Sequence, residues 1–320
     1  MSGCGAPEVI EILALSRTFD LARIFADANT DRVRVISPDQ VTDPARVDVA
    51  LSWAPEDRAF DAYPNLRMVS SIAAGVDRIL TCPSLPPQVV VTRIRDQGQA
   101  DMMAGFAAWH VVWHHRRMGD YVANQASRTW DRSFRAPPPG RVRVGILGYG
   151  LMGQACARAI AAMGFPVLAA RSSAGAVQAP TGVQVIGGEG AIQAVAAQSD
   201  ILINTLPLTD STRDLLDAAL FAQMPKGAVL VQIGRGEHLV EADLLAALDS
   251  GQLSAASIDV FRVEPPPDDH PFWGHPNILV TPHRASDSSR PEILRQIAEN
   301  YQAVREGRRP PGLVDRASGY

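Results

Sequence analysis

The stretch "VRVGILGYGLMGQACARAIAAMG", residues 142–164, decides the fold because it joins a strand pattern to a helix pattern through a glycine-rich turn. The apolar run Val142–Leu147 predicts a buried strand, and the alanine-rich run after the turn favours a helix. The turn itself reads Gly148-Tyr149-Gly150-Leu151-Met152-Gly153. This is G-x-G-x-x-G in the strand–turn–helix context that a dinucleotide site requires.

The spacing of these glycines has a chemical reason. Gly148 permits the tight turn, Gly150 lets the main chain approach a pyrophosphate, and Gly153 lets the helix pack closely on the strand. Leu151 and Met152 open the helix, where N–H donors and the positive end of the helix dipole attract phosphate. Glycines can also mark a purely structural turn, but the flanking strand and helix favour a Rossmann dinucleotide-binding domain.

The end of the next strand pattern, "VLAARSS" at residues 167–173, indicates which dinucleotide binds. An NAD site usually carries an acidic residue here, which accepts from the ribose hydroxyls. No acid occurs between Arg171 and Gly188, and Arg171, Ser172 and Ser173 together suit a 2′-phosphate. We predict that the protein prefers NADP, with NAD as the alternative cofactor; the competing interpretation makes Arg171 a solvated loop residue.

Composition and charge exclude several classes of protein. The 320 residues are 46% hydrophobic and 20% charged, as in a soluble globular protein long enough for two domains. A net charge of -4 gives no basic footprint for nucleic acid. We find no signal peptide and no apolar run long enough to span a membrane. Cys4, Cys82 and Cys156 show no disulfide or zinc spacing, so we expect a cytoplasmic protein.

Strand patterns alternate with helix patterns through most of the chain. Five short apolar runs precede residue 100 and seven follow residue 140, with helical periodicity between them. This alternation predicts α/β architecture with parallel sheets.

Three charged residues follow predicted strands in the second half of the chain. Arg235 lies in "QIGRG", Glu264 in "IDVFRVEPPP" and His283 in "ILVTPHRAS". Ligands of open parallel sheets bind beyond the carboxyl ends of the strands, so we expect all three on the cofactor side. Taken singly, each has an ordinary alternative: a surface arginine, a solvated loop acid and a hydrogen-bonded loop histidine.

The motifs together resemble the D-isomer-specific 2-hydroxyacid dehydrogenase family over nearly the whole chain. The resemblance rests on "GILGYGLMG", "IGRG", "DVFRVEPP" followed by "HPFWGHPNILVTPH", and "SIAAGVDRIL". It is nearest to the glyoxylate/hydroxypyruvate reductase A branch in "DVALSWAP", "RRMGDY" and "GLVDRASGY". It implies two doubly wound parallel-sheet domains. A Rossmann domain, residues 101–289, is inserted into a flavodoxin-like substrate domain made of residues 1–100 and 290–320.

The resemblance also implies an activity, the NAD(P)H-dependent reduction of small 2-oxo acids such as glyoxylate and hydroxypyruvate. Arg235 would bind and polarise the 2-oxo acid, His283 would donate the proton, and Glu264 would hold the imidazole. A fixed cation stabilises the charge that develops on a carbonyl oxygen during reduction, and histidine titrates in a useful range. The predicted chemistry therefore agrees with the residue types.

The remaining roles that the resemblance implies concern binding. Asp259 would accept from the nicotinamide carboxamide, and three further residues would contact the cofactor: Leu206, Pro207 and Ile233. The main-chain amides of Ala74, Gly75 and Val76 would bind the substrate carboxylate, with Trp53 in the pocket wall.

Two departures and several alternatives stay open at this stage. The family usually has asparagine where Gln232 stands and alanine where Gly234 stands, and "RASDSS" replaces a small apolar run at residues 284–289.

The pair His110 and His114 has helical spacing but no evident third zinc ligand, so we expect no metal. The apolar-rich helix 99–118 suggests a homodimer. The rival functions are a phosphoglycerate- or phosphite-type dehydrogenase and a non-catalytic dinucleotide-sensing protein.

Overall fold

The computed structural model describes residues 9–319, which form two compact units. Unit 1 combines the described residues up to 96 with those from 288 onward, and unit 2 comprises residues 97–287. The first boundary falls before helix α3 (Gln97–His115), which belongs whole to unit 2 because a continuous helix is one hydrogen-bonded element. Cys82 and Cys156 are buried free thiols, whereas Cys4 lies outside the described residues.

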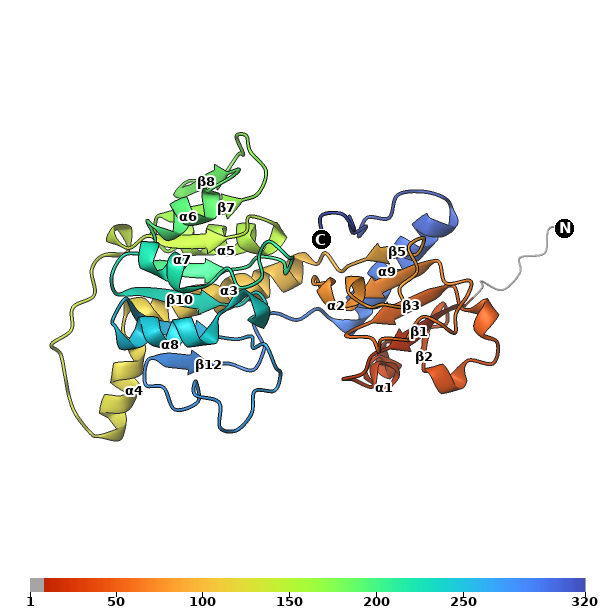
Figure 1. The fold of residues 1–320 in the computed structure, drawn as a ribbon, viewed down its shortest axis with the longest axis horizontal. Helices are drawn as coiled ribbons and strands as arrows, with labels where there is room; N and C mark the ends of the chain where they lie inside the picture. Colours follow the sequence, from red (N-terminus) through yellow and green to blue (C-terminus); the bar gives the residue numbers. More distant parts are fainter. Residues whose placement is uncertain (1–8, 320) are drawn as a thin grey trace. The chain divides into compact units, whose positions relative to one another are not determined.

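Unit 1 is built on a five-stranded sheet in which every neighbouring pair is parallel (Figure 1). The order β2-β1-β3-β4-β5 is the flavodoxin-like order, so this part of the predicted fold is confirmed. The strands are β1 (Ile10–Leu15), β2 (Val33–Ile36), β3 (Val49–Ser52), β4 (Met68–Ser71) and β5 (Val90–Thr92).

The helices of unit 1 are α1 (Leu21–Ile24), α2 (Asp77–Leu80) and α9 (Arg290–Arg305). Alternate strand residues pack on opposite faces of the sheet: Ile12 belongs to the cluster with α1 and α9, and Leu13 belongs to the cluster with α2. The helix pattern over residues 19–28 yields only one α-helical turn, followed by a 3₁₀ turn at Ala26–Ala28.

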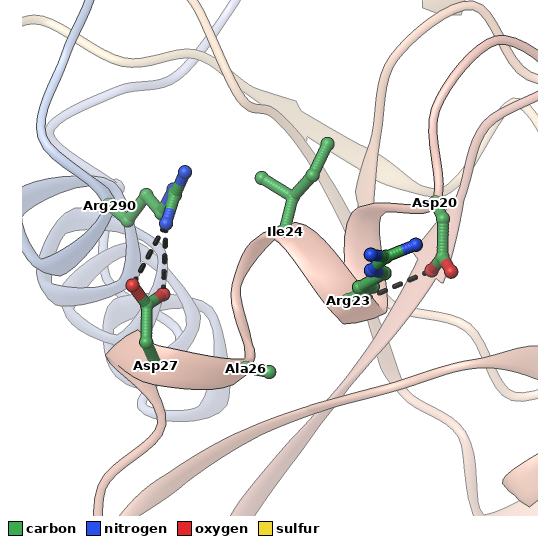
Figure 2. A pocket seen from close by; sticks show the side chains of 6 residues that line it. All are labelled: Asp20, Arg23, Ile24, Ala26, Asp27 and Arg290. Carbon is green, nitrogen blue, oxygen red and sulfur yellow. Dashed lines mark hydrogen bonds and ion pairs between the residues drawn. The ribbon is translucent and has the colours of Figure 1, made fainter.

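A pocket of unit 1, about 550 Å³, lies beside α1 and the start of α9 (Figure 2). Arg290 pairs there with Asp27 at 2.9 Å, and Asp20 caps α1 by accepting from the Arg23 amide at 3.0 Å. The other lining residues are Ile24 and Ala26. None of the predicted site residues lines this pocket.

Unit 2 is built on a seven-stranded parallel sheet in the order β12-β11-β10-β9-β6-β7-β8 (Figure 1). Read from β8, this is the Rossmann order 3-2-1-4-5-6 extended by one strand, as predicted. The strands are β6 (Val144–Leu147), β7 (Val167–Arg171), β8 (Val183–Gly187), β9 (Ile201–Asn204), β10 (Ala228–Gln232), β11 (Leu253–Ile258) and β12 (Ile278–Val280).

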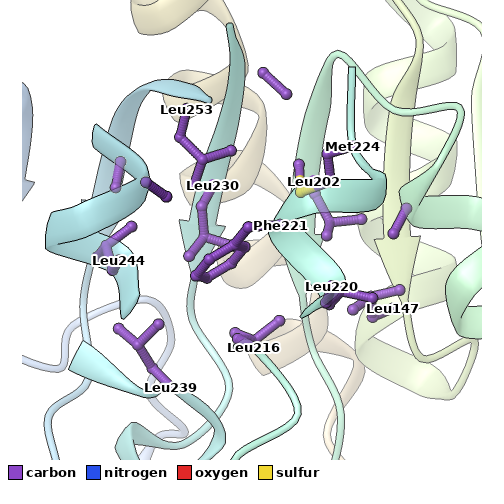
Figure 3. Packing of buried hydrophobic residues seen from close by; sticks show 14 of the residues in the cluster. Leu147, Leu202, Leu216, Leu220, Phe221, Met224, Leu230, Leu239, Leu244 and Leu253 are labelled. Atoms are coloured by element: carbon purple, nitrogen blue, oxygen red, sulfur yellow. The ribbon is translucent and has the colours of Figure 1, made fainter. Parts of the chain in front are cut away.

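Helices cover both faces of this sheet. α3 and α5 (Leu151–Ala162) pack on one face, and three shorter helices pack on the other: α6 (Ala191–Ala196), α7 (Ala218–Gln223) and α8 (Glu241–Asp249). On the second face, Phe221 of α7 and Leu244 of α8 lie close to Leu230 of β10 (Figure 3). After α3 the left-handed Arg117 turns the chain into α4 (Met118–Ala126). Among residues 9–319, no helix has the length and apolarity needed to cross a bilayer.

The two histidines at helical spacing on α3 share one hydroxyl group of the sheet. His110 Nδ1 and His114 Nε2 lie 2.9 Å and 2.7 Å from Ser257 Oγ on β11. Burial lowers the pKa of His110 to about 3, with a further contribution from His114, and lowers the pKa of His114 to about 4. Within the described part of the chain, no three His, Cys, Asp or Glu side chains are grouped as metal ligands.

Candidate active site

The glycine-rich turn between β6 and α5 has the geometry of a phosphate cradle. Gly148 has a left-handed φ of +97°, and a Cβ on Gly153 would lie 1.9 Å from the Gly148 carbonyl oxygen. Neither position therefore tolerates a side chain. Gly150, by contrast, has no neighbouring atom within 4 Å of a Cβ, and no side chain caps the helix that it starts. The turn leaves main chain open to a pyrophosphate, with Leu151 and Met152 in the first helical turn.

The end of β7 carries the residues expected to recognise a 2′-phosphate. The Arg171 guanidinium donates from Nε to Ser173 Oγ at 3.0 Å, and the Arg171 carbonyl accepts from the Gly188 amide at 3.1 Å. Ser172 and Ser173 are both exposed. A guanidinium beside two hydroxyls, with no carboxylate at the strand end, fits an NADP phosphate better than two ribose hydroxyls.

Asn204, at the end of β9, organises the predicted cofactor residues that follow it. Its side-chain oxygen accepts from the Leu206 amide at 3.1 Å, and its main-chain oxygen accepts from the Ile233 amide at 3.4 Å. Thr205 supports the glycine turn by donating from Oγ1 to the Leu147 carbonyl at 2.9 Å. Sequence reasoning missed both residues, because neither belongs to a local motif.

Arg235 follows β10 in an extended conformation and is held through its main chain. Its amide donates to His238 Nδ1 at 3.1 Å, and its carbonyl accepts from Gln232 Nε2 at 2.9 Å. The guanidinium NH1 donates to the Gly234 carbonyl at 3.0 Å. Gly236 is required because a Cβ there would lie 1.9 Å from the main chain of Phe261. The glycines therefore allow close main-chain packing that fixes the position of Arg235, and they do not make this segment flexible.

His283 and Glu264, the two residues predicted to act together on the proton, form a hydrogen-bonded pair. His283 Nδ1 lies 2.7 Å from Glu264 Oε2, and Glu264 Oε1 accepts from the Phe261 amide at 2.9 Å. Partial burial raises the pKa of Glu264, but the hydrogen bond and charge of His283, the Phe261 amide and the charge of Arg235 together hold it below its ordinary value. Glu264 is therefore a carboxylate, and the Nε2 atom of His283 is the ring nitrogen that the pair leaves to a substrate.

Asp259 holds the segment that carries His283. Its buried carboxylate accepts from Thr281 Oγ1 at 2.7 Å, from the Arg284 amide at 2.9 Å and from the Ala285 amide at 3.0 Å. Its carbonyl accepts from the His283 amide at 2.8 Å. His283 has a left-handed φ of +52°, which is costly for a residue with a side chain. These four bonds hold that conformation, whereas contact with a nicotinamide carboxamide stays a prediction.

The substrate residues predicted in unit 1 follow the ends of two adjacent strands. Trp53 comes directly after β3, and its amide donates to the Leu15 carbonyl at 3.2 Å. Ala74, Gly75 and Val76 lie between β4 and α2. Ser71, which sequence reasoning missed, donates from Oγ to the Gly75 carbonyl at 2.6 Å and so shapes this loop.

Comparison with known proteins assigns the family. The model of the D-isomer specific 2-hydroxyacid dehydrogenase NAD binding domain matches residues 108–285. The chain is 36% identical over 284 residues to glyoxylate/hydroxypyruvate reductase A of Yersinia enterocolitica, covering 87% of this chain and 89% of that protein.

The chain belongs to the D-isomer specific 2-hydroxyacid dehydrogenases.

Solved structures of this dehydrogenase family agree. A member from Xanthobacter autotrophicus in complex with NADPH and MES is similar at a TM-score of 0.88 and 34% identity, covering 97% of this chain and 99% of that one. An NADPH-dependent glyoxylate/hydroxypyruvate reductase from Sinorhizobium meliloti, in complex with NADP and sulfate, is similar at 0.88 and 32% identity, with the same coverage. The family resemblance and the predicted fold class are thus confirmed, while the role of each site residue stays a prediction.

Proposed function

We propose that this dehydrogenase uses NADPH to reduce small 2-oxo acids, glyoxylate and hydroxypyruvate foremost, to 2-hydroxy acids. The observation that carries the proposal is the His283–Glu264 pair at 2.7 Å, in which a carboxylate holds the imidazole that would exchange the proton. The relatives named glyoxylate/hydroxypyruvate reductase A support the choice of acid. NADP, bound in the related structures, supports the choice of cofactor, as does Arg171.

In this proposal the chain's own residues handle the carboxylate, the carbonyl and the proton. The amides of Ala74, Gly75 and Val76 bind the substrate carboxylate, and Trp53 limits the length of the acid. The Arg235 guanidinium polarises the 2-oxo group and stabilises the negative charge that grows on its oxygen. When bound, NADPH supplies the hydride that attacks C2. His283 Nε2 gives its proton to the oxygen, and the product is the 2-hydroxy acid.

The residues that would hold NADP come from five strand ends of unit 2. The glycine turn and the first residues of α5 would bind the pyrophosphate, and Arg171, Ser172 and Ser173 would bind the 2′-phosphate. Leu206, Pro207, Ile233 and Asp259 would contact the nicotinamide half.

We also propose that the protein is a cytoplasmic homodimer. Large apolar side chains of α3, α4 and the segment after them stand in solvent: Trp109 is 50% exposed, Val122 57% and Trp130 90%. Trp109 stacks on Trp113 with ring centroids 5.0 Å apart. A second copy of the chain would remove this surface from water. Sedimentation showing a monomer at micromolar concentration would refute the dimer without affecting the proposed chemistry.

The proposed activity is tested with the purified protein and a panel of acids. Oxidation of NADPH by glyoxylate and hydroxypyruvate is compared with NADP⁺ reduction by 3-phosphoglycerate and by phosphite. We expect turnover with the two small 2-oxo acids and its loss in His283→Ala. Tight NADPH binding without turnover of any acid would instead favour a dinucleotide-sensing protein.

A further inference from the structure

Three buried polar side chains from neighbouring elements lie together next to the main chain of Arg235. Asn204 ends β9, Gln232 ends β10, and His238 closes the 3₁₀ turn Gly236–His238. All three are completely inaccessible to solvent. A polar group is stable at such depth only when its donors and acceptors are paired, so their hydrogen bonds define what this cluster does.

The amide groups of Asn204 and Gln232 have one consistent orientation. Asn204 Oδ1 accepts from the Leu206 amide at 3.1 Å, so its NH₂ group faces Gln232 Oε1 and His238 Nδ1, each at 2.8 Å. Gln232 Oε1 also accepts from the Gly234 amide at 3.2 Å. Gln232 Nε2 is then left to donate, and it donates to the carbonyl of Arg235 at 2.9 Å.

His238 completes the cluster as a neutral imidazole. Its Nδ1 atom faces two N–H donors, from Asn204 and from the Arg235 amide at 3.1 Å, so the ring proton is on Nε2. Nε2 donates to the Pro207 carbonyl at 3.2 Å. The imidazole therefore joins the turn that bears Arg235 to the segment that follows β9.

The cluster holds the main chain of Arg235 from both sides, at its amide and at its carbonyl, and also holds Leu206 and Pro207. We propose that Asn204, Gln232 and His238 are positioning residues that fix the substrate-binding arginine in register with the cofactor-binding segment Leu206–Pro207. This inference rests on the proposed function, in which Arg235 binds the 2-oxo acid.

The cluster also accounts for the two departures from the family pattern in this stretch. A Cβ on Gly234 would lie 2.8 Å from Asn204 Nδ2 and 3.0 Å from His238 Nδ1, and its backbone is not left-handed, so only this contact excludes a side chain. Gln232 is one methylene longer than the usual asparagine, and its Oε1 atom accepts from this Nδ2 atom of Asn204 at 2.8 Å. Gln232 and Gly234 are therefore coupled through Asn204: Gln232 Oε1 accepts from the same Nδ2 atom that a Cβ on Gly234 would approach.

The first experiment replaces His238 and compares it with a histidine of equal burial elsewhere in unit 2. His238→Phe keeps a ring but removes the hydrogen bonds to Asn204, to the Arg235 amide and to the Pro207 carbonyl, whereas His110→Phe removes the bond to Ser257 on β11. In His238→Phe the Arg235 amide should exchange hydrogen faster, and the KM for glyoxylate should rise roughly tenfold through misplacement of the guanidinium. His238→Gln, which keeps a donor and an acceptor, should restore part of both.

The second experiment uses Gly234→Ala, which adds one methyl group against the Asn204 and His238 side chains. Its KM for glyoxylate should rise severalfold, and the double variant Gln232→Asn/Gly234→Ala should recover more than half of that loss. Equal changes of KM in His238→Phe and His110→Phe, or an unaltered Arg235 amide together with additive effects at 232 and 234, would overturn the positioning role. If the unaltered protein reduces no 2-oxo acid, the proposed function fails, yet amide exchange still tests the cluster.

Discussion

The charge of Glu264 should contribute directly to the rate of the reaction. Glu264→Gln keeps the length of the side chain but removes the carboxylate that lies 2.7 Å from His283 Nδ1. Two unit charges about 4 Å apart attract by roughly 4 kcal/mol at an effective dielectric constant near 20. His283 and Glu264 are 36% and 35% exposed, and solvent screening reduces the attraction to about 1 kcal/mol. This corresponds to roughly a fivefold change in kcat/KM.

The direction of the change follows from the charge that develops on the ring. When the imidazole accepts the proton of a 2-hydroxy acid it becomes positively charged, and the carboxylate stabilises that charge. Glu264→Gln should therefore lower kcat/KM for oxidation by roughly fivefold. Reduction should fall by the same factor, because the equilibrium constant of the reaction does not depend on the enzyme.

The assay measures kcat/KM for glyoxylate reduction and glycolate oxidation at one pH, in the unaltered protein and in Glu264→Gln. Glu241→Gln is a matched control, because Glu241 pairs with His270 at 3.3 Å in the same unit and belongs to no predicted site. Its kcat/KM should stay unchanged. An unchanged kcat/KM in Glu264→Gln, or an equal fall in the control, would refute the electrostatic role of Glu264.

Three further predictions address the cofactor, the substrate and acid stability. Arg171→Asp should lower kcat/KM for NADPH by roughly tenfold or more while sparing NADH, because a carboxylate repels the 2′-phosphate; a native enzyme that favours NADH would contradict this. Trp53→Ala should raise kcat/KM for longer 2-oxo acids relative to glyoxylate, and an unchanged ratio in the acid panel would remove Trp53 from the pocket wall. Burial lowers the pKa of His114 to about 4. Below about pH 6.5 the unfolded chain therefore binds a proton that the folded chain does not bind. The free energy of unfolding should therefore fall as the pH drops from about 6.5 to 4, and urea titrations of His114→Gln should show a smaller fall.

The sheets were predictable because their signals are local. Apolar runs such as Val229–Val231 and the glycine turn at 148–153 identify strands and the crossover to α5 without knowledge of the rest of the chain. Helix length was less predictable. Leu21 and Phe25 repeat at i and i+4 and are both buried, yet α1 ends at Ile24, since the chain tightens into a 3₁₀ turn.

The supports of the site could not be predicted from any local pattern. Arg235, Glu264 and His283 belong to recognisable motifs, but the groups that orient them come from other strands. Asn204 meets His238 across 34 residues, and Thr281 meets Asp259 across 22. Such partners can be identified only once the strand order is known, because that order places the carboxyl ends of the strands side by side.

The last prediction distinguishes two roles for Asp259. The sequence resemblance gives its carboxylate to the nicotinamide, whereas in the structure both oxygens already accept from the His283 segment and the residue is 1% exposed. In Asp259→Asn an NH₂ group must face one of those donors, which costs about 1–3 kcal/mol.

If Asp259 positions His283, the variant should lose stability and kcat. The Kd of NADPH should stay within about twofold, a difference in binding free energy well below the 1.4 kcal/mol of a tenfold change. Asp217→Ala is the control: Asp217 caps α7 by accepting from the Leu220 amide at 2.8 Å, so the loss of that acceptor should lower stability alone. The Kd of NADPH is measured by fluorescence titration and kcat at saturating cofactor. A weakened Kd with unchanged kcat would return Asp259 to the nicotinamide. A variant that loses kcat and keeps its affinity for NADPH would show that the Asp259 carboxylate stabilises the left-handed conformation at His283 through its hydrogen bonds to this segment.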